Sequence, residues 1–447
     1  MNADERATKA TGMSRRSFIK AGGAVLGGAA ITGLNLETGA LEAFAADGGR
    51  ALREGGAADV GISRARLDDV AARVRNRIDR GLMPGAVVLV ARHGQVVLHQ
   101  AMGAKEAGKD AMTKDTLFDL ESNTKVLATA ISYMLLVERR AVSLSDPIAK
   151  FLPHFATNGK EHVTLRDMLR YSSGLPIDIN LPGAPNLADV PSPSALWTLM
   201  EETPLEYPTG TKVEYSDLTY RLLGHTFEAI TGQNLQQFAK ANVWSKLGMT
   251  RTTYNPLDNG FTVSDTAATG PGSWNLRTGT IRGVVEDDFD WVMGGIVGCD
   301  GLFSTAHDIA VFLQLILNDG SYGGVKILSP STVRTMTADQ TPQVNETVDV
   351  DPISNLLFTH KGYGWELWTH RFSSGGMRLT PGSFGKAGGA GTFFWVDRRR
   401  DLFGVFLTNH GLPVPFDGPG WAAMLDNIGV YEFYDGVINS LNSERRD

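Results

Sequence analysis

The sequence lacks the residues from which disulfides and thiolate metal clusters are built. Its 447 residues include one cysteine, Cys299, so no disulfide can form within the chain. None of its nine histidines takes part in a His-x-His or His-Glu-x-x-His pattern. We therefore expect no metal site and no cofactor. Cys299 lies between glycines in the run GGIVGCDGLFS with no histidine nearby, so we expect a buried structural residue.

A basic surface for nucleic acid is also missing. The 42 lysines and arginines are outnumbered by 49 acidic residues, which gives a formal net charge of −7. The one short basic run, Arg398 to Arg400, lies between Asp397 and Asp401 and is typical of a solvated turn. Because the chain has no dense basic stripe, we expect no nucleic-acid partner.

The N-terminal segment has the features of an export signal. Residues Ser14 to Lys20 read SRRSFIK, which closely matches a twin-arginine signal. The apolar run from Ala21 to Leu34 is too short and too rich in Gly and Ala to span a bilayer comfortably. Ala43 to Ala45 gives a signal-peptidase site, with cleavage expected after Ala45. An uncleaved anchor and an ordinary secretory signal are the alternatives.

These features predict two parts of the chain. Residues 1–45 are expected to be a twin-arginine signal peptide. Residues 46–447, in which no repeat or interdomain linker occurs, are expected to form one domain. Since the twin-arginine machinery exports folded proteins, that domain would function in the periplasm or outside the cell, without stable membrane insertion.

Strand patterns lie near both ends of the expected domain. Ala86 to Ala91 and Gln95 to Ala101 are β-rich runs joined by a short turn, which predicts a hairpin. Thr392 to Val396 and Leu402 to Leu407 predict a second hairpin. The chain between them is mainly helical, as in the segment from Leu218 to Ile230, which has apolar residues at helical spacing.

This order of elements predicts an α/β fold of the α+β kind. An antiparallel sheet would be built from both ends of the domain, from about residues 60–120 and 295–447, and flanked by helices. The region of about residues 121–294 would form a mainly helical insertion.

Ser122 and Lys125 open the apolar run that continues to Leu136. On a helix, residues three apart lie on one face, so an amine would stand beside a hydroxyl. A serine becomes a nucleophile when a base takes its proton, and the positive end of the helix would disfavour protonated Lys125. Taken alone the pattern is weak, because it recurs at Ser17/Lys20 and Ser383/Lys386. Ser122 by itself would more often be a helix cap.

Two further motifs accompany this pair. Tyr215-Ser216-Asp217 stands where a helix begins, and Gly385-Lys386-Ala387-Gly388-Gly389 leads into the C-terminal hairpin. With the Ser122 motif, they resemble in order and rough spacing the three motifs of the serine β-lactamase and penicillin-binding protein superfamily. The resemblance is greatest to class C-like members and related carboxylesterases. It covers nearly the whole expected domain, through SSGLP, TYRLLGHTFEAITG, SKLGM, GLFSTAHDIAVF and GAGTFFWVDRRRDLFGVFLTN.

The resemblance implies a β-lactamase-like fold and a role for each matching residue. Ser122 would be the nucleophile that forms an acyl-enzyme, while Lys125 and Tyr215 would share the general-base and general-acid work. Lys386 would hold the phenol of Tyr215 towards its ionised form and steer a substrate anion. The backbone N–H groups of Ser122 and Gly389 would form the oxyanion hole.

The resemblance also implies a substrate contact at Asp217, Ala387 and Gly388, and two of these depart from the family pattern. Many members have Asn in place of Asp217, which cannot donate an amide hydrogen bond but could pair with Lys125 or Lys386. A helix N-cap is an equally good role for Asp217. Ala387 lacks the hydroxyl that usually holds a substrate carboxylate. Both departures weaken recognition of a β-lactam or an acyl-D-Ala-D-Ala peptide.

Together these features predict an exported serine hydrolase that cleaves a small-molecule ester, or less favourably an amide, through an acyl-enzyme on Ser122. One alternative is a β-lactamase or D-Ala-D-Ala carboxypeptidase. Another is a catalytically silent penicillin-binding-like module, against which the intact set of Ser122, Lys125, Tyr215 and Lys386 argues. For Trp365 and the loop from Pro176 to Pro193, packing is a more natural role than lining the acyl pocket.

Overall fold

A computed structural model describes residues 49–179, 189, 191–270, 276–341, 360–368, 374–412 and 418–442. The expected signal peptide at residues 1–45 and much of the loop from Pro176 to Pro193 lie outside these described residues. No helix within the described part is long and apolar enough to cross a bilayer.

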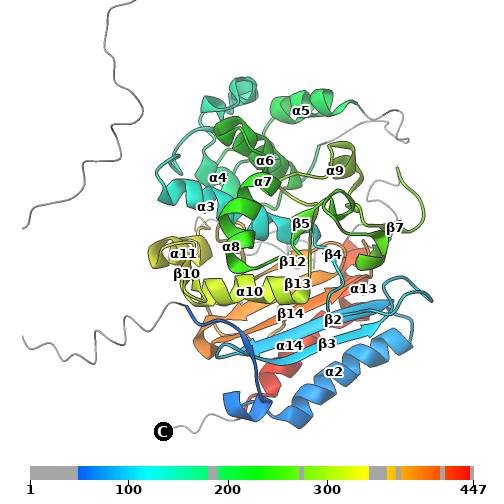
Figure 1. Ribbon diagram of the computed structural model, residues 1–447. Helices are drawn as coiled ribbons and strands as arrows, with labels where there is room; N and C mark the ends of the chain where they lie inside the picture. Colours follow the sequence, from blue (N-terminus) through cyan, green and yellow to red (C-terminus); the bar gives the residue numbers. More distant parts are fainter. Residues whose placement is uncertain are drawn as a thin grey trace, which may run out of the picture. The chain divides into compact units, whose positions relative to one another are not determined.

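The main sheet joins the two hairpins expected at the ends of the domain (Figure 1). Its strand order is β1-β3-β2-β14-β13-β12-β11. The strands are β1 (Arg53–Glu54), β2 (Gly85–Arg92), β3 (Gln95–Gly103), β11 (Glu366–Leu367), β12 (Phe384–Gly388), β13 (Thr392–Asp397) and β14 (Leu402–Thr408). β1 pairs parallel with β3, and the other neighbours pair antiparallel. The antiparallel sheet built from both ends is thus confirmed.

The two halves of the sheet meet where β2 pairs with β14, with Val87 opposite Leu407 and Val90 opposite Gly404. Every residue of β2 is buried, because both faces of the sheet are covered. Side chains alternate along the strand, so Val87 and Leu89 join one apolar cluster while Val88 and Val90 join another. The core therefore has two layers separated by the sheet.

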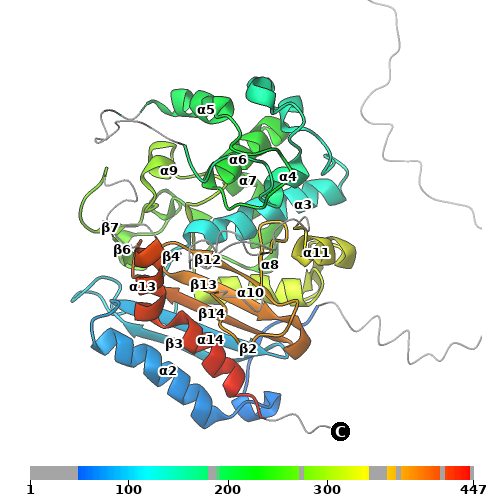
Figure 2. The ribbon, with the colours of Figure 1, turned by 180° about the vertical axis from the view of Figure 1, so that it is seen from behind.

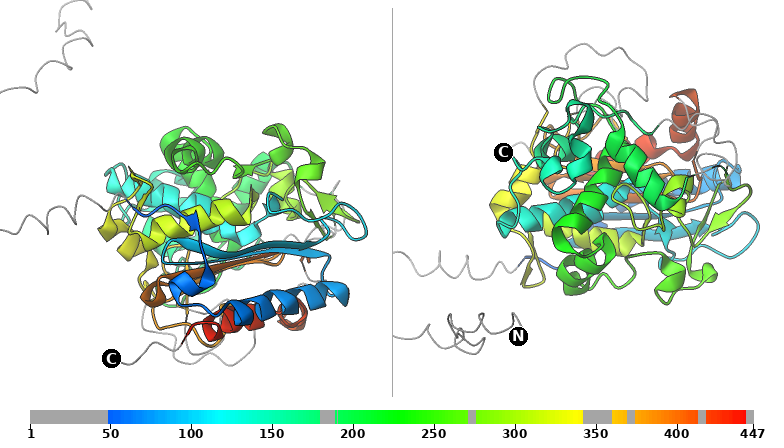
Figure 3. Two further views of the ribbon diagram at one scale, coloured as in Figure 1. Left: turned by 60° about the horizontal axis from the view of Figure 1, so that its bottom comes forward. Right: turned by 90° about the horizontal axis from the view of Figure 1, so that it is seen from above.

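One face of the sheet carries helices from the two ends of the domain (Figures 2 and 3). These are α2 (Arg64–Asp79), α13 (Gly418–Ile428) and α14 (Val430–Asn439). α2 begins where Ser63 accepts a hydrogen bond from Arg66 N and ends before Gly81, which has φ +73°.

The other face carries α10 (Ala306–Leu317) and the mainly helical region (Figure 3). That region includes α3 (Ile131–Glu138), α4 (Leu165–Leu169), α5 (Pro193–Glu202), α6 (Asp217–Thr231), α7 (Leu235–Ala239), α8 (Ser245–Leu247) and α9 (Asp288–Val292). α11 (Pro330–Thr337) lies beside α3. Small sheets are formed by β4 (Phe118–Asp119), β8 (Leu302–Ser304) and β5 (Thr253–Tyr254), by β6 (Ala268–Thr269) and β7 (Ile281–Arg282), and by β9 (Ser321–Tyr322) and β10 (Val325–Lys326). The helical region thus lies against the face of β12 that bears Lys386.

Candidate active site

Ser122 lies in a sharp turn between β4 and the buried helix behind it. The preceding residue, Glu121, has φ +48°, an uncommon value for a residue with a side chain. Ser122 is partly exposed, whereas the residues on both sides of it are buried. The helix predicted from this point is present, but its first part is a 3₁₀ turn (Glu121–Asn123) followed by a π-helix (Lys125–Ala130) and then α3. Strain is therefore concentrated at the residue that presents the serine.

The turn is fixed against the C-terminal hairpin by side chains and by one close backbone approach. Asn123 Nδ2 donates to Thr392 O at 3.1 Å and to its Oγ1 at 2.9 Å, and Thr392 Oγ1 donates to Leu120 O at 3.0 Å. A Cβ at Gly388 would lie 2.3 Å from Leu120 O. Since only glycine permits this approach, Gly388 brings β12 against the Ser122 turn, with Gly389 next in the chain.

Lys125 is fully buried and lies directly behind Ser122. Its Nζ donates to Ser122 Oγ at 2.9 Å and to Cys299 O at 3.2 Å. It also lies 2.6 Å from Asp217 Oδ1 and 3.7 Å from Asp300 Oδ1. The amine and the hydroxyl predicted to meet on one helical face are therefore in contact.

Tyr215 reaches the same point from the residue before the cap of α6. Its hydroxyl lies 2.5 Å from Ser122 Oγ and donates to Asp217 Oδ1 at 2.9 Å. Ser216, the N-cap of α6, accepts from Thr219 N and donates to Pro176 O at 2.6 Å. The SSGLP turn, which ends at Pro176, thus holds the start of α6 in place. The Tyr215 ring stacks on the Tyr171 ring, with ring centroids 5.5 Å apart.

The charge state of Lys125 differs from the sequence-based expectation. Burial favours the neutral amine, but Asp217 and Asp300 outweigh it and raise the pKa of Lys125 well above its ordinary value. The expectation that the helix terminus would disfavour protonated Lys125 is therefore wrong, because two carboxylates that are distant in sequence lie beside it.

The expected effect of Lys386 on Tyr215 is also wrong. Lys386 Nζ lies 4.8 Å from the centre of the Tyr215 ring but forms its ion pair with Glu366 Oε1 at 2.6 Å. Burial, with the nearby charges of Asp217 and Asp300, raises the pKa of Tyr215 well above its ordinary value. The phenol is thus held in its neutral form.

The two positions that depart from the family pattern lie in different places. Asp217 follows the N-cap Ser216, so the capping role is wrong and the pairing with Lys125 is confirmed. Ala387 belongs to the apolar cluster that includes Phe393 on the α2 side of the sheet. Adjacent residues of a strand point to opposite faces, so the side chain of Ala387 points away from Lys386 and the site.

Sequence reasoning missed two carboxylates of the site. Asp300 Oδ1 lies 3.3 Å from Ser122 Oγ, and Glu366 accepts a hydrogen bond from Lys386. Each follows a residue that had been considered for another reason, Cys299 and Trp365. Trp365 is fully buried against Phe384 and other aromatic rings, as its expected packing role requires. The available signal was an acidic residue inside an apolar, glycine-rich run.

One group of described side chains has metal-ligand chemistry. Ligand atoms of Asp217, Cys299 and Asp300 lie within 4.8 Å of one another. However, the ammonium of Lys125 lies among them and supplies the cation. Burial raises the pKa of the Cys299 thiol, whose Sγ donates to Asp290 Oδ2 at 2.9 Å, so the thiol is a structural group.

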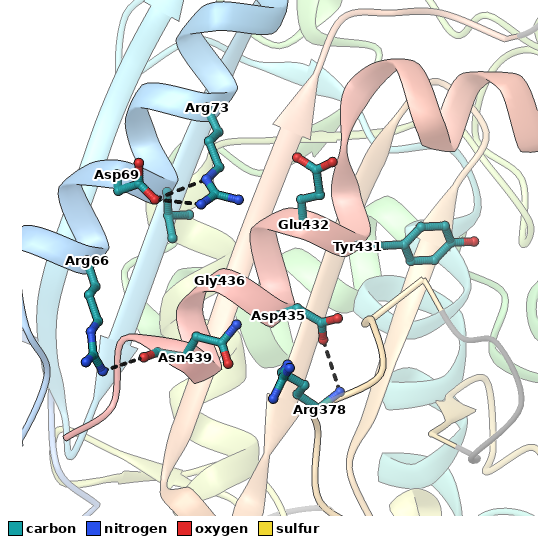
Figure 4. Close-up of a pocket in the computed structure, with 10 residues that line it drawn as sticks. Arg66, Asp69, Arg73, Arg378, Tyr431, Glu432, Asp435, Gly436 and Asn439 are labelled. Carbon is teal, nitrogen blue, oxygen red and sulfur yellow. Dashed lines mark hydrogen bonds and ion pairs between the residues drawn. The ribbon is translucent and has the colours of Figure 1, made fainter. Parts of the chain in front are cut away.

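A surface pocket between α2 and α14 lies on the opposite face of the sheet from Ser122 (Figure 4). Its charged side chains contact protein groups: Arg73 pairs with Asp69, Arg66 donates to Asn439 O, and Asp435 accepts from the backbone of Arg378. The groups that could perform acyl transfer converge at Ser122 and not in this pocket.

Comparison with known proteins agrees with this geometry. Residues 70–427 match the family described as Beta-lactamase. A Salmonella agona protein, provisionally named as a D-alanyl-D-alanine carboxypeptidase, is 33% identical over 350 residues, which cover 70% of this chain and 81% of that protein.

Solved structures share the fold at lower identity. EstCE1, described as a hydrolase with promiscuous acyltransferase activity, has a TM-score of 0.63 and 20% identity over 82% of this chain and 99% of its own. A class C β-lactamase from Rhodobacter sphaeroides has a TM-score of 0.60 and 20% identity over 83% and 99%. These likenesses establish the β-lactamase-like fold.

Proposed function

The chain belongs to the β-lactamase family of serine hydrolases, and from this membership we propose that it cleaves esters through an acyl-enzyme on Ser122. The observation that carries the proposal is the contact of Ser122 Oγ with Tyr215 OH at 2.5 Å and Lys125 Nζ at 2.9 Å. A hydroxyl in contact with both groups can lose its proton as it attacks a carbonyl.

The reaction would proceed in two stages. Ser122 attacks the ester carbonyl, and the backbone N–H groups of Ser122 and Gly389 stabilise the oxyanion, each contributing about 3 kcal/mol. The alcohol leaves, and water then hydrolyses the acyl-enzyme. The close approach of Gly388 to Leu120 supports this arrangement, because it keeps the Gly389 segment beside the Ser122 turn.

Three features favour a simple ester over a β-lactam or an acyl-D-Ala-D-Ala peptide. The Lys386 ammonium, which would receive a substrate carboxylate, is paired with Glu366 at 2.6 Å. Ala387 offers no hydroxyl and points to the other face of the sheet. Asp217 accepts hydrogen bonds from Lys125 and Tyr215 and cannot donate one to an acylamide carbonyl.

A D-Ala-D-Ala carboxypeptidase is the second candidate function. The provisional name of the Salmonella agona relative supports it, since 33% identity extends over most of both chains. The same Ser122 acyl-enzyme would serve, with D-alanine as the leaving group.

Export by the twin-arginine route to the periplasm or cell exterior remains part of the proposal. It rests on the SRRSFIK motif at Ser14 to Lys20 and on the small residues at Ala43 and Ala45. A fusion of residues 1–45 to a reporter should be exported, and replacing Arg15 and Arg16 with Lys should block export.

The proposed function is tested with purified residues 46–447 and the Ser122→Ala variant. A short-chain nitrophenyl ester, a chromogenic cephalosporin and a diacyl-D-Ala-D-Ala peptide are compared at equal enzyme concentration. We expect ester turnover in the unsubstituted enzyme and its loss in Ser122→Ala.

Other outcomes identify other functions. Rapid release of D-alanine with slow ester cleavage would favour the carboxypeptidase, and rapid cephalosporin turnover would favour a β-lactamase. If no substrate reacts and a fluorescent penicillin does not label Ser122, the protein is a catalytically silent module.

A further inference from the structure

The contacts of Lys125 exclude it as the acceptor of the Ser122 proton in this arrangement. An ammonium has three N–H donors and no acceptor. Lys125 Nζ has three close acceptors, Asp217 Oδ1 at 2.6 Å, Ser122 Oγ at 2.9 Å and Cys299 O at 3.2 Å. All three donors are therefore used, and the group has no lone pair to offer the serine.

Tyr215 offers an acceptor that Lys125 lacks. Its single O–H donates to Asp217 Oδ1 at 2.9 Å, which leaves its oxygen lone pairs directed elsewhere. Ser122 Oγ lies 2.5 Å from that oxygen, so the serine is the donor in this contact. The three groups thus form a directed chain of hydrogen bonds from Ser122 through Tyr215 to Asp217.

We propose that Asp217 is the final acceptor of the Ser122 proton, which reaches it through the hydroxyl of Tyr215. This inference rests on the proposed acyl-enzyme chemistry at Ser122. It assigns Asp217 a role in proton transfer, where the family resemblance implied contact with substrate.

The proton movements balance. As Ser122 attacks, its proton passes to the Tyr215 oxygen and the Tyr215 proton passes to Asp217, while the carbonyl π electrons become the oxyanion. When the intermediate collapses, the bond to the alcohol breaks, the alkoxide takes a proton from Tyr215, and Tyr215 recovers one from Asp217. Water repeats the sequence during deacylation. Lys125 remains an ammonium throughout and stabilises the serine oxygen.

Charged or titratable groups face Asp217 from several elements. They are Lys125 on the π-helix, Tyr215 before α6, Arg221 on α6, Asp178 in the preceding loop, Asp300 before β8 and Lys386 on β12. Burial opposes ionisation of Asp217, but Lys125 and Arg221 outweigh it and lower its pKa. The carboxylate is therefore available as an acceptor from acid to alkaline pH.

Asp300 provides a matched control. It is also an aspartate beside Lys125, at 3.7 Å, and its Oδ1 lies 3.3 Å from Ser122 Oγ, outside the chain through Tyr215. Asp217→Asn and Asp300→Asn each remove one negative charge near Lys125. Only the first removes the proposed end of the proton path.

The test is the pH dependence of kcat/KM for 4-nitrophenyl acetate in the unsubstituted enzyme, Asp217→Asn, Asp217→Glu and Asp300→Asn. In Asp217→Asn the path through Tyr215 ends at the Tyr215 phenolate or the Lys125 amine, whose ordinary pKa values are about 10. We expect a loss of about 100-fold or more at pH 7 and an acid limb that moves up by about two pH units or more. Asp217→Glu should keep its acid limb at low pH, even if its kcat/KM falls.

Two results would overturn the inference. One is an acid limb in Asp217→Asn at the same pH as in the unsubstituted enzyme, which would reduce Asp217 to a structural role. The other is an equal movement of the limb in Asp300→Asn, which would assign proton acceptance to Asp300. The rate at which a fluorophosphonate labels Ser122 should show the same acid limb in its pH dependence. An enzyme that labels but hydrolyses no ester would contradict the proposed function alone, while one that does neither would contradict both.

Discussion

Two buried lysines flank Tyr215, and their surroundings are opposite. Lys125 is one cation between two carboxylates, Asp217 and Asp300, whereas Glu366 is one carboxylate between Lys386 and Lys361. The lysine nitrogens Lys125 Nζ and Lys386 Nζ lie 5.0 and 4.8 Å from the Tyr215 ring centre.

The difference in partners sets the proton affinity of each lysine. The pKa of Lys125 is raised, because its two carboxylates outweigh burial. The pKa of Lys386 is lowered by burial and by the charge of Lys125, although Glu366 opposes them. Equal burial therefore gives opposite shifts, and the number of opposite charges within reach decides the direction in which each lysine pKa moves.

Replacing each of these two lysines in turn should have the largest effects on stability and activity. Lys125→Met leaves two neighbouring carboxylates without their cation, so we expect the free energy of unfolding to fall by about 3 kcal/mol and ester turnover to be lost. Lys386→Met leaves Glu366 with Lys361 nearby and should cost about half as much. Urea unfolding of both variants measures this, and a larger cost at Lys386 would contradict the comparison.

Gly388 tests whether the two lysine environments must stay close together. It lies on the strand of Lys386, and an added Cβ would meet Leu120 O at 2.3 Å and Thr392 Oγ1 at 2.4 Å. Gly388→Ala should push β12 from the Ser122 turn, lowering kcat/KM by about 100-fold and stability by about 2 kcal/mol. Normal kinetics in this variant would show that the approach of β12 is not required.

Lys361, the second lysine beside Glu366, can be tested through the pH dependence of stability. Burial and the charge of Lys386 lower the pKa of Lys361 from 10.5 to about 7, although Glu366 opposes them. Between these pH values the unfolded chain binds a proton that the folded protein releases, so stability rises with pH. From pH 7 to pH 9 the stability of the unsubstituted enzyme relative to Lys361→Met should increase by about 2 kcal/mol. A constant difference in urea unfolding experiments would contradict the lowered pKa.

The smallest effect is expected on the far face of the sheet. Arg73 and Asp69 form an ion pair on α2 whose side chains are both 59% exposed. Solvent screens such a pair, so Arg73→Ala should change stability by about 0.5 kcal/mol or less and leave kcat/KM unchanged. A clear loss of activity would connect the α2–α14 pocket to the site and contradict their separation by the sheet.

Local sequence patterns predicted the parts of the structure that depend on residues close together in the chain or on a known motif. The β-rich runs joined by short turns predicted both hairpins, and the Ser122 and Tyr215 motifs predicted side chains that are in contact. Each of these depends on local composition or on a motif with a fixed order.

What the sequence did not predict depends on long-range assembly. Asp300 is 178 residues from Ser122, and the pairing of β8 with β4 brings its segment there. Without that neighbour and Asp217, the protonation of Lys125 could not be inferred. The orientation of Ala387 depends on β12, a strand that the sequence did not predict, because Lys386 and Ala387 are adjacent in it and point to opposite faces.

The most direct test of acyl transfer at Ser122 is the covalent intermediate itself. The enzyme is mixed with a nitrophenyl ester, quenched in acid within one turnover, digested, and analysed by mass spectrometry. We expect an acyl group on the peptide that contains Ser122 and none in Ser122→Ala. An acyl group on another residue, or unchanged ester turnover in Ser122→Ala, would contradict it.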